Sequence, residues 1–507
     1  MNDPEELADQ RALLDTDAWL ALSRERRQSR AGDRFEPAFH FTSPDGTIND
    51  PNGLCCWQGR YHLFYQSTPP ENPYQHWGHA VSEDLVNWAD LPLAIAPGPE
   101  ERVFSGSTLV EADRVVAMYH GVGLGNMIAT ASDPLLLDWT KSPANPVIPL
   151  APESEDGLPY RVFDPFLWKE DDSYYSLSGT YIGPPGARFT GEKNRMVEHL
   201  FRSPDLVNWA HVGTLLEGGD LVGVGNDGAC PYFLPIGNRH VLFFFSHRSG
   251  PYAVVGDYDS ATHRFAPDHV VKFNHGPVGS SSLHAPSACS DGEGGLYLVF
   301  NIKPGNDPLA RTGAMGATIH CTLEDGTLGL RPVEAIAGLR SRSEIAAAVR
   351  VREDAPFESA LRSATCEIEL EVEFGDARSI ELRVLASDDG REYSTITLYR
   401  REIWRDERVT HEISVSIDTT HSSLAGGIQG RPPEWCVVPS VEGEPVDLRV
   451  FVDRSIIEVF ANSRRYLMQV AYPSLDESDR IVLSARGGDA KAIRIAAHEL
   501  RPMSREV

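Results

Sequence analysis

The spacing of apolar residues changes near residue 34. Between Leu7 and Arg30, apolar side chains recur at helical intervals, which predicts one amphipathic helix with Leu13, Leu14, Trp19, Leu20 and Leu22 on its apolar side. Beyond Arg34, short apolar or alternating runs such as 61–65 and 241–245 are separated by Gly, Pro, Asn and Asp. Runs of this kind bounded by turn residues are typical of β-strands. The chain after the first helix is therefore predicted to be all-β.

A string that ends in tryptophan recurs along the first half of the chain. It stands at 82–88 and 203–209, with a weaker copy at 132–139. Repeats of about 40 to 60 residues, each with several strands, are typical of β-propellers. We expect the tryptophans to pack within and between blades rather than to contact a ligand.

Five polar, turn-like strings recur at a similar interval. They begin at positions 50, 104, 163, 227 and 284, in steps of 54, 59, 64 and 57 residues. One string per blade predicts five blades, with each string at the inner edge of its blade. Because the innermost strands of a propeller converge on its axis, residues more than a hundred positions apart can face one site there.

The repeat ends around residues 328–339. From Arg342 onward the strands alternate strictly, as in 366–373, which predicts half-buried antiparallel sheets. We therefore expect three regions: an N-terminal helical extension over 1–38, a five-bladed β-propeller over 39–338, and a β-sandwich over 339–507.

Composition limits which binding partners and which cellular compartment we expect for this chain. With 46 Lys and Arg against 73 Asp and Glu, the net charge of −27 disfavours nucleic acid and anionic membranes as partners. Apolar runs fall short of the roughly 20 residues of a membrane span, and residues 1–30 lack the apolar core of a secretion signal. The seven cysteines are scattered and show no metal-ligand spacing, so we read them as reduced thiols. These features predict a cytoplasmic protein.

The segment 47–53, Thr-Ile-Asn-Asp-Pro-Asn-Gly, carries the strongest chemical signal. Pro51 fixes φ and Asn52-Gly53 favours positive φ, so Asp50 precedes a tight turn at the start of a strand. Such a carboxylate suits a nucleophile that faces the propeller axis. Taken alone, the same string also fits a hairpin turn with a capping Asp.

Several motifs together resemble glycoside hydrolase family 32, which includes invertases, inulinases and levanases. The matching segments are 49–53, Gln66 with Trp77-Gly78, 104–107, Asp164-Pro165, Cys230-Pro231 and 450–462. The resemblance covers nearly the whole chain after about Phe39. It implies a five-bladed propeller followed by a β-sandwich, in agreement with the strand pattern.

The resemblance also implies roles for individual residues. Asp50 would be the nucleophile that forms a fructosyl-enzyme intermediate, and Asp164 would stabilise the transition state by holding fructose hydroxyls. The remaining matched positions would line the same fructose subsite: Asn49, Gln66, Trp77, Phe104 and Ser105. Chemistry of this kind needs no metal and no cofactor.

The chain departs from the family pattern just before Asp164. The family has Arg-Asp-Pro there, and this chain has Phe163 in the Arg position. Arg161 lies two residues earlier, on the same face of an extended strand, and is expected to reach the same hydroxyls.

A second departure removes the expected proton donor. The family's acid/base is a Glu immediately before Cys-Pro, and this chain has Ala229. Asp227 is the nearest carboxylate, and if the strand is extended it shares a face with Ala229; Gly228 would let the backbone bulge inward. We expect Asp227 to replace the acid, with a capping role in a turn as the alternative. His284 and Glu293 are the other candidates, and His284 is otherwise expected to bind the substrate.

Three functions remain open at this stage. The first is a retaining hydrolase of β-fructofuranosides, acting on sucrose or short fructans. The second is a fructosyltransferase, which uses the same nucleophile but passes the fructosyl group to a sugar hydroxyl. The third is a propeller that binds a fructoside without turnover. Because no cluster of Lys or Arg accompanies the five strings, an unphosphorylated small carbohydrate is the expected partner; the sequence indicates no oligomeric state.

Overall fold

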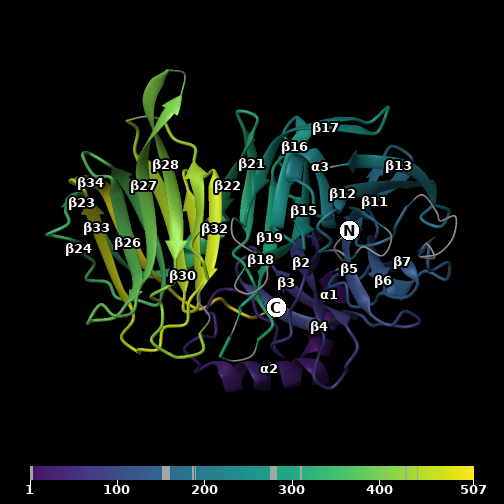
Figure 1. The fold of residues 1–507 in the computed structure, drawn as a ribbon. Coiled ribbons are helices and arrows are strands. Elements are labelled where there is room, and N and C mark those ends of the chain that lie inside the picture. The colour runs from purple at the N-terminus through teal and green to yellow at the C-terminus, as the bar shows by residue number, and fades with distance from the viewer. Residues whose placement is uncertain are drawn as a thin grey trace.

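The computed structural model describes residues 4–506 except 151–159, 185–187, 189, 218, 275–281, 306, 309–310, 406, 429–430 and 442. Over these residues the strands form seven antiparallel sheets, five of them with four or five strands and two with six (Figure 1). The smaller sheets are the blades of a five-bladed propeller, and the two larger sheets form a β-sandwich beside it. The predicted all-β fold class is confirmed.

The blades follow one another along the chain, and in each the strand that comes first is innermost. The first blade contains β1 (Pro51–Trp57), β2 (Arg60–Ser67), β3 (His76–Ser82) and β4 (Trp88–Ile95); the second contains β5 (Val103–Val110), β6 (Val115–Gly121), β7 (Gly125–Ala131), β8 (Thr140–Lys141) and β9 (Ile148–Pro149). The third contains β10 (Pro165–Glu170), β11 (Ser173–Ile182), β12 (Arg195–Ser203) and β13 (Ala210–Glu217).

The last two blades and the sandwich complete the molecule. The fourth blade contains β14 (Ala229–Ile236), β15 (Arg239–Ser246), β16 (Gly250–Asp259) and β17 (Arg264–Lys272), after the short α3 (Gly219–Val222); the fifth contains β18 (Leu283–Ser290), β19 (Leu296–Ile302), β20 (Ala314–Met315), β21 (Ile319–Glu324) and β22 (Thr327–Pro332). The 3₁₀-helix η1 (Glu334–Leu339) leads into the sandwich.

The sandwich pairs two sheets over an apolar core. One sheet contains β23 (Arg340–Val351), β25 (Thr365–Glu373), β30 (Val446–Asp453), β31 (Ile456–Ala461), β32 (Arg465–Val470) and β34 (Ala490–Leu500). The other contains β24 (Phe357–Glu358), β26 (Ser379–Ala386), β27 (Ser394–Arg405), β28 (Arg408–Asp418), β29 (Glu434–Val438) and β33 (Arg480–Arg486).

Each of the five polar strings lies at the start of an innermost strand. Four of these strands, β1, β5, β14 and β18, carry a β-bulge within their first few residues, as their pairing registers shift at 52/55, 103/106, 229/232 and 283/286. A bulge turns the side chains beside it away from regular alternation and re-aims them. The repeated bulge therefore directs the start of these four strands toward the axis.

A buried tyrosine hydroxyl ties these strands together beneath that end. Tyr232 donates a hydrogen bond to the carbonyl oxygen of Gly106 (3.0 Å) and accepts one from the main-chain N–H of Gly53 (3.0 Å). Its oxygen also lies 2.8 Å from Oγ of Ser287. One side chain thus links β1, β5, β14 and β18.

The recurring tryptophan string forms the turn between the third and fourth strands of a blade. In the first and third blades a leucine adopts positive φ (Leu85 and Leu206, both 66°), and the indole N–H of the following tryptophan donates to that leucine's carbonyl oxygen. Trp88 is buried in the core. These contacts agree with the predicted packing role of the tryptophans.

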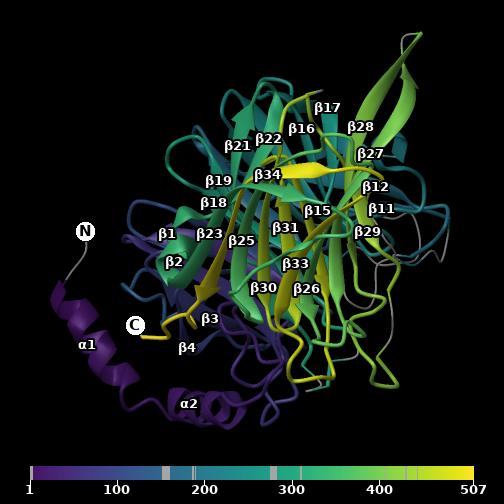
Figure 2. The same ribbon diagram turned by 90° about the vertical axis from the view of Figure 1, so that its left-hand side faces the viewer.

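The N-terminal segment is helical but does not form the single helix predicted for Leu7 to Arg30. It forms α1 (Pro4–Leu14) and α2 (Ala18–Arg30), and the two helices meet at an angle (Figure 2). The break comes at Asp17, whose side chain accepts a hydrogen bond from the N–H of Leu20 (2.8 Å) and so caps α2. Helical periodicity continued across this break because apolar residues flank it on both sides.

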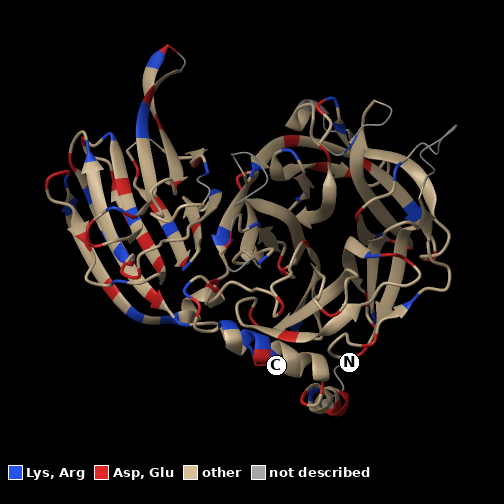
Figure 3. Ribbon diagram, turned by 60° about the horizontal axis from the view of Figure 1, so that its bottom comes forward, with Lys and Arg blue, Asp and Glu red and all other residues tan. Residues whose placement is uncertain are grey.

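The described helices are short, and charged residues of both signs are spread over the molecule. In the part of the chain that the structure describes, no helix is both long enough and apolar enough to cross a bilayer. Asp and Glu are spread over strands and loops of both domains, and α2 carries a group of arginines (Figure 3). One of them, Arg27, is paired with Asp90 of β4 at 2.5 Å.

The propeller and the sandwich share a buried ionic cluster. His40 lies between two sandwich carboxylates, with Nδ1 2.8 Å from Asp453 and Nε2 3.0 Å from Glu458, and all three side chains are fully buried. Asp453 also accepts hydrogen bonds from the main-chain N–H groups of residues 38, 39 and 40. The segment 450–462 thus binds the main chain of residues 38–40.

Aromatic side chains extend this junction. Phe39 packs on Phe451 (ring centroids 6.4 Å apart), and Phe300 stacks on Tyr466 (6.5 Å). These residues belong to one continuous apolar core that runs from the propeller into the sandwich. The two domains therefore pack as one unit.

We predict that Asp453→Asn destabilises the whole molecule by about 3 to 5 kcal/mol, because His40 and the main-chain N–H groups of residues 38–40 lose a buried, charged acceptor. Urea unfolding monitored by intrinsic fluorescence measures the loss. Asp476→Asn is the matched control, since Asp476 is 95% exposed and pairs with Arg34 at the surface; its cost should stay within about 1 kcal/mol. Equal effects of the two variants would contradict the account.

The same cluster predicts a pH dependence of stability. Burial lowers the pKa of His40, but Glu458 and Asp453 outweigh it and raise the pKa to about 9. The stabilisation from this imidazolium is therefore complete below about pH 6.5, the unfolded value, and is lost as the pH rises through about 9. Urea midpoints measured between pH 6 and pH 10 should fall over this window in the wild-type protein and less steeply in His40→Gln.

Candidate active site

Two carboxylates from different blades meet at one thiol. Asp50 precedes β1 and Asp164 precedes β10, and Sγ of Cys230 lies 3.9 Å from Oδ2 of Asp50 and 3.3 Å from Oδ2 of Asp164. The main-chain N–H of Cys230 also donates to Oδ2 of Asp164 (3.3 Å). The structure thus brings together the two acids that the sequence placed at the start of the first and third blades.

Asp50 is held as an anion. Its Oδ1 lies 2.9 Å from Nδ1 of His284, and its Oδ2 accepts a hydrogen bond from Oγ of Ser105 (2.9 Å). Burial raises its pKa, but His284, Lys303 and Ser105 together lower it to about 2. Asp50 is therefore ionised at neutral pH, the state that a nucleophile requires.

His284 donates to Asp50 rather than receiving a proton from it. Burial lowers the pKa of His284 more than the Asp50 charge raises it, so the ring is neutral at neutral pH. An ionised carboxylate accepts hydrogen bonds only, which places the ring proton on Nδ1. The structure places His284, which the sequence predicts as a substrate-binding residue with general acid as an alternative, directly against Asp50.

Asp164 has the opposite protonation behaviour. Burial and the negative charge of Asp50 raise its pKa to about 7, although the Cys230 thiol and main-chain N–H partly oppose the shift. Two neighbouring carboxylates whose environments push their pKa values apart can take different roles at one pH. Here one acid is fixed as an anion, and the other titrates near neutrality.

A chain of amides and hydroxyls connects the predicted subsite residues to Asp50. Asn49 Nδ2 donates to Gln66 Oε1 (2.8 Å), Gln66 Nε2 donates to Ser105 Oγ (2.7 Å), and Ser105 donates to Asp50. The ammonium group of Lys303 donates to Oδ1 of Asn49. These contacts fix the orientation of each side chain, so the polar wall beside Asp50 is preorganised.

The aromatic residues divide into partly exposed and buried members. Phe104 and Phe163 are partly exposed, and Phe163 stacks on His120 (4.7 Å between ring centroids). Trp77, predicted to line the subsite, has no exposed surface, and its indole N–H donates to the carbonyl oxygen of Phe104 (2.8 Å). It therefore supports the Phe104 main chain from below, because the β3 face that carries it is turned into the core.

Arg161 does not lie on the carboxylate pair. It precedes β10 in a segment without strand pairing, and its guanidinium donates to the hydroxyl of Tyr181 (3.0 Å) and stacks over that ring at 4.8 Å. The alternation that placed Arg161 on the face of Phe163 holds within a paired strand, and β10 begins only at Pro165. Its proposed reach to the fructose hydroxyls has no support in this arrangement.

The position of the missing glutamate lies at the bulge of β14. Ala229 is buried beside Phe245 and Ala285, and Cys230 adopts positive φ (52°), an uncommon conformation for a residue other than glycine. Strain of this kind persists where the surroundings enforce it, as they often do at functional sites. The bulge is what aims the Cys230 thiol at the two carboxylates.

Asp227 does not face the carboxylate pair as an open acid. It is fully buried, accepts a hydrogen bond from the main-chain N–H of His247 (2.9 Å), and lies 2.8 Å from Nδ1 of the same residue. It also precedes β14, so the shared strand face that we predicted for Asp227 and Ala229 does not exist. The expectation that Asp227 itself protonates a leaving group is not met by this geometry.

A second buried acid lies behind Gly228. Both carboxyl oxygens of Glu198 are enclosed, without a hydrogen-bond partner among the described residues. Burial, followed by the charges of Asp227 and Asp164, raises its pKa well above the usual value, which favours the protonated form. A Cβ at position 228 would approach Oε1 of Glu198 to 2.3 Å, so Gly228 leaves room for this side chain. Glu293, by contrast, is exposed in the turn at the far end of β18 from His284.

Sequence reasoning missed His247, Lys303 and Glu198. His247 carried only a weak signal: it is the first residue after β15 and stands two positions beyond Phe245, which pairs with Ala229. Lys303 follows β19 without a recognisable motif. Glu198 is one of several polar residues in a buried middle strand, and nothing local distinguishes it.

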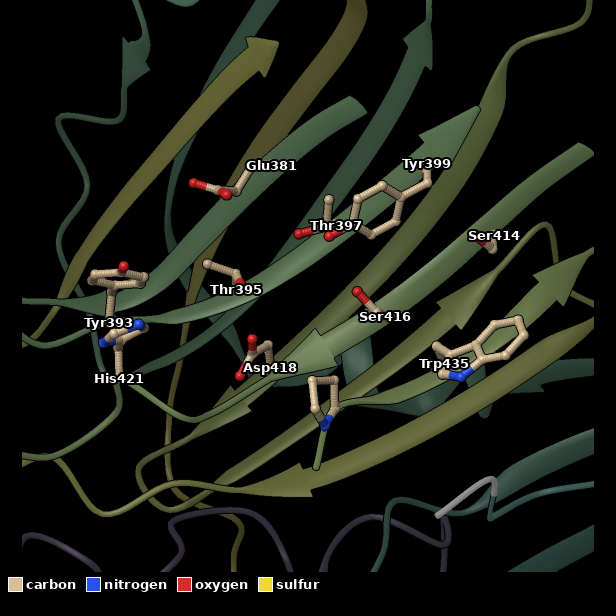
Figure 4. Close-up of a pocket in the computed structure, with 11 residues that line it drawn as sticks. Glu381, Tyr393, Thr395, Thr397, Tyr399, Ser414, Ser416, Asp418, His421 and Trp435 are labelled. Carbon is tan, nitrogen blue, oxygen red and sulfur yellow. The ribbon is translucent and has the colours of Figure 1, made fainter. Parts of the chain in front are cut away.

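A separate hollow of about 430 Å³ lies on the sandwich (Figure 4). Its lining is mostly polar and aromatic. It includes Tyr399 and two threonines of β27, two serines of β28, Trp435 of β29, and also Tyr393, Glu381 and Asp418. Glu381 pairs with Arg383 (2.6 Å) and Asp418 accepts a main-chain hydrogen bond from Thr420 (2.8 Å), so both carboxylates are already engaged locally. The two carboxylates that meet at the Cys230 thiol lie in the propeller instead.

The chain matches a known enzyme family and several of its members in sequence. Residues 40–288 match the profile described as glycosyl hydrolases family 32 N-terminal domain, and residues 335–499 match that of the family 32 C terminal. A sucrose-6-phosphate hydrolase of Zymomonas mobilis subsp. mobilis is 27% identical over 480 residues, covering 87% of this chain and 87% of that protein. A fructan 6-exohydrolase of Beta vulgaris is 32% identical over 222 residues, or 40% of this chain and 34% of that protein.

Solved structures share the fold. Fructan 1-exohydrolase IIa from Cichorium intybus superposes with a TM-score of 0.79 at 22% identity, covering 93% of this chain and 98% of that one. Sucrose-6-phosphate hydrolase from Lactobacillus gasseri gives 0.74 at 21% identity, covering 95% and 96%. At this identity the likeness concerns the architecture of propeller and sandwich.

The coupling of the two carboxylates can be tested without a substrate. In Asp50→Asn the pKa of Asp164 should fall below its value of about 7, because the neighbouring negative charge is removed while burial remains. Carbon-13 NMR of aspartate-labelled protein, with Asp164 assigned by Asp164→Asn, measures the shift. Ser105→Ala keeps both charges and should leave Asp164 titrating near 7. An unchanged or higher Asp164 pKa in Asp50→Asn would contradict the coupling.

Proposed function

Because the chain belongs to glycosyl hydrolase family 32 and is a glycoside hydrolase, we propose that it hydrolyses β-fructofuranosides with retention through a fructosyl intermediate on Asp50. Asp50 attacks the anomeric carbon of the fructosyl unit, and the bond to the leaving-group oxygen breaks. Water then attacks the same carbon and releases Asp50.

The observation that carries this proposal is the contrast between the two acids at Cys230. Asp50 has a pKa of about 2 and stays anionic, as a nucleophile must. Asp164, with a pKa of about 7, is placed to exchange hydrogen bonds with the fructose hydroxyls. Asn49, Gln66 and Ser105 supply the fixed polar wall of the subsite.

We propose sucrose or a short fructan as the substrate. The relatives include sucrose-6-phosphate hydrolases and a fructan exohydrolase, so phosphorylated and unphosphorylated sugars both enter the test. Two cationic side chains among the described residues, Lys303 and Arg161, are already engaged, by Asn49 and Tyr181 respectively. This favours an uncharged sugar over a phosphorylated one.

Product analysis separates the remaining alternatives. Incubation with sucrose and with 1-kestose should release free fructose. Longer or cyclic products would indicate a fructosyltransferase, and binding without turnover would indicate a non-catalytic fructoside-binding propeller. Sucrose 6-phosphate, assayed alongside, should be cleaved less efficiently than sucrose.

We also propose that the protein works in the cytoplasm. All seven cysteines, each of which lies in a described segment, are free thiols. Free thiols in this number are typical of a reducing compartment.

The nucleophile is tested by Asp50→Asn, which should lower kcat on fructosides by about 10³-fold or more, because the covalent intermediate no longer forms. Asp113→Asn, at an exposed position on the β5–β6 turn, should retain wild-type turnover. NMR of the first product formed should show the β-anomer of fructose. Turnover by Asp50→Asn within about tenfold of wild type would contradict the assignment.

A further inference from the structure

We propose that His247, oriented by Asp227, is the general acid and base of the fructosidase reaction, and that this dyad replaces the glutamate absent at Ala229. The inference rests on the proposed function and deepens it. It assigns to the site a proton donor of a different chemical type from the one that the family pattern led us to expect.

The pairing of β14 with β15 brings His247 close to residue 229, where the family has its glutamate. Ala229 of β14 pairs with Phe245 of β15, and His247 follows Phe245 by two residues. His247 lies in the turn that follows β15, and its ring contacts that of Phe245, with centroids 5.2 Å apart. Because directly paired residues of neighbouring strands share a face, this contact places the imidazole beside the side chain that stands opposite Ala229.

Ring contacts connect His247 to the nucleophile. Its ring centroid is 6.3 Å from that of His284, and His284 lies 2.9 Å from Asp50. The side chain of His247 is 37% exposed, whereas Asp227 is fully enclosed. His247 is thus the residue of this pair that a substrate can reach.

Asp227 fixes the ring without reaching the substrate. It accepts the main-chain N–H of His247 and holds Nδ1 at 2.8 Å, while Ser246 Oγ contacts its Oδ1 at 3.4 Å. A carboxylate that binds one ring nitrogen sets the tautomer and leaves proton exchange to the other. Asp227 is therefore a positioning residue, and Nε2 is the exchanging atom.

The charges around His247 favour the protonated ring that an acid needs. Burial lowers its pKa, but the Asp227 hydrogen bond and the charges of Asp227, Asp164 and Asp50 outweigh burial and raise it. His284, the remaining titratable neighbour, is neutral. A general acid works best with a pKa near the operating pH, which an imidazole reaches with a small shift.

The proton balance closes over the two steps. In the first, Asp50 forms the bond to the anomeric carbon, the bonding electrons pass to the glycosidic oxygen, and Nε2 of His247 gives that oxygen its proton. In the second, neutral Nε2 takes a proton from water as the water oxygen attacks the anomeric carbon and Asp50 leaves. His247 ends protonated, and Nδ1 keeps its proton throughout.

Glu198 is the competing acid, since burial and the charges of Asp227 and Asp164 raise its pKa and favour its protonated form. Its oxygens are enclosed behind Gly228, however, with no surface through which a glycosidic oxygen could approach. Donation from Glu198 would require the 225–228 loop, which Gly228 anchors to Thr180 (3.0 Å), to move away. Exposure therefore favours His247.

The test uses the purified full-length protein and two substrates that differ in leaving group. His247→Ala should lower kcat on sucrose by about 100-fold or more, because the glucose oxygen needs a proton to leave. Formation of the fructosyl-enzyme from p-nitrophenyl β-fructofuranoside should be nearly spared, since that leaving group needs none. Added imidazole should restore part of the sucrose activity.

The matched control is His320→Ala. His320 pairs with Asp291 at 2.9 Å and is 33% exposed, so it resembles His247 in geometry but lies in an outer strand of the fifth blade. Both activities should be unchanged in it. Asp227→Asn tests the positioning role: by lowering the His247 pKa it should move the alkaline limb of kcat/KM to lower pH, by about one unit.

The outcomes separate this inference from the proposed function. If wild-type protein releases fructose but His247→Ala keeps sucrose turnover within about threefold, the dyad is not the acid. The same conclusion follows if Glu198→Gln, rather than His247→Ala, shows the leaving-group split. Equal loss on both substrates without imidazole rescue, in a variant with wild-type thermal unfolding, also overturns it. If wild-type protein cleaves no fructoside, the proposed function itself falls.

Discussion

The site is organised by a limit on buried charge: two carboxylates share one thiol, and the surroundings stabilise one negative charge. His284, Lys303 and Ser105 all act on Asp50, which lowers its pKa to about 2. Burial and the negative charge of Asp50 raise the pKa of Asp164 to about 7. His247, the proposed acid, lies within the field of both carboxylates.

An imidazole suits that field better than another carboxylate. It is cationic when it holds the proton and neutral when it does not, so it never adds a negative charge to the Asp50 and Asp164 pair. In His247 the cation is further stabilised by Asp227, which is buried behind it. Burial and the charges of Asp227 and Asp164 also raise the pKa of Glu198, so this region disfavours an additional anion.

Much of the fold was predictable because its signals are local. The strings at 50, 104, 163, 227 and 284 do begin the innermost strands, and turn chemistry around Asp50 identified the first acid. Errors arose where alternation was extended beyond a paired strand. Arg161 and Asp227 both precede the strands to which they were assigned, and Trp77 is turned into the core. The bulge that aims Cys230, and the pairing of Ala229 with Phe245, depend on register between strands and carry no local signal.

The most direct measurement is a crystal structure of Asp50→Asn with sucrose bound. The account predicts the fructosyl anomeric carbon beside residue 50 and Nε2 of His247 about 2.6 to 3.2 Å from the glycosidic oxygen, with Nδ1 still on Asp227. A complex in which Glu198 or Asp227 contacts that oxygen, with His247 turned away from it, would contradict the account.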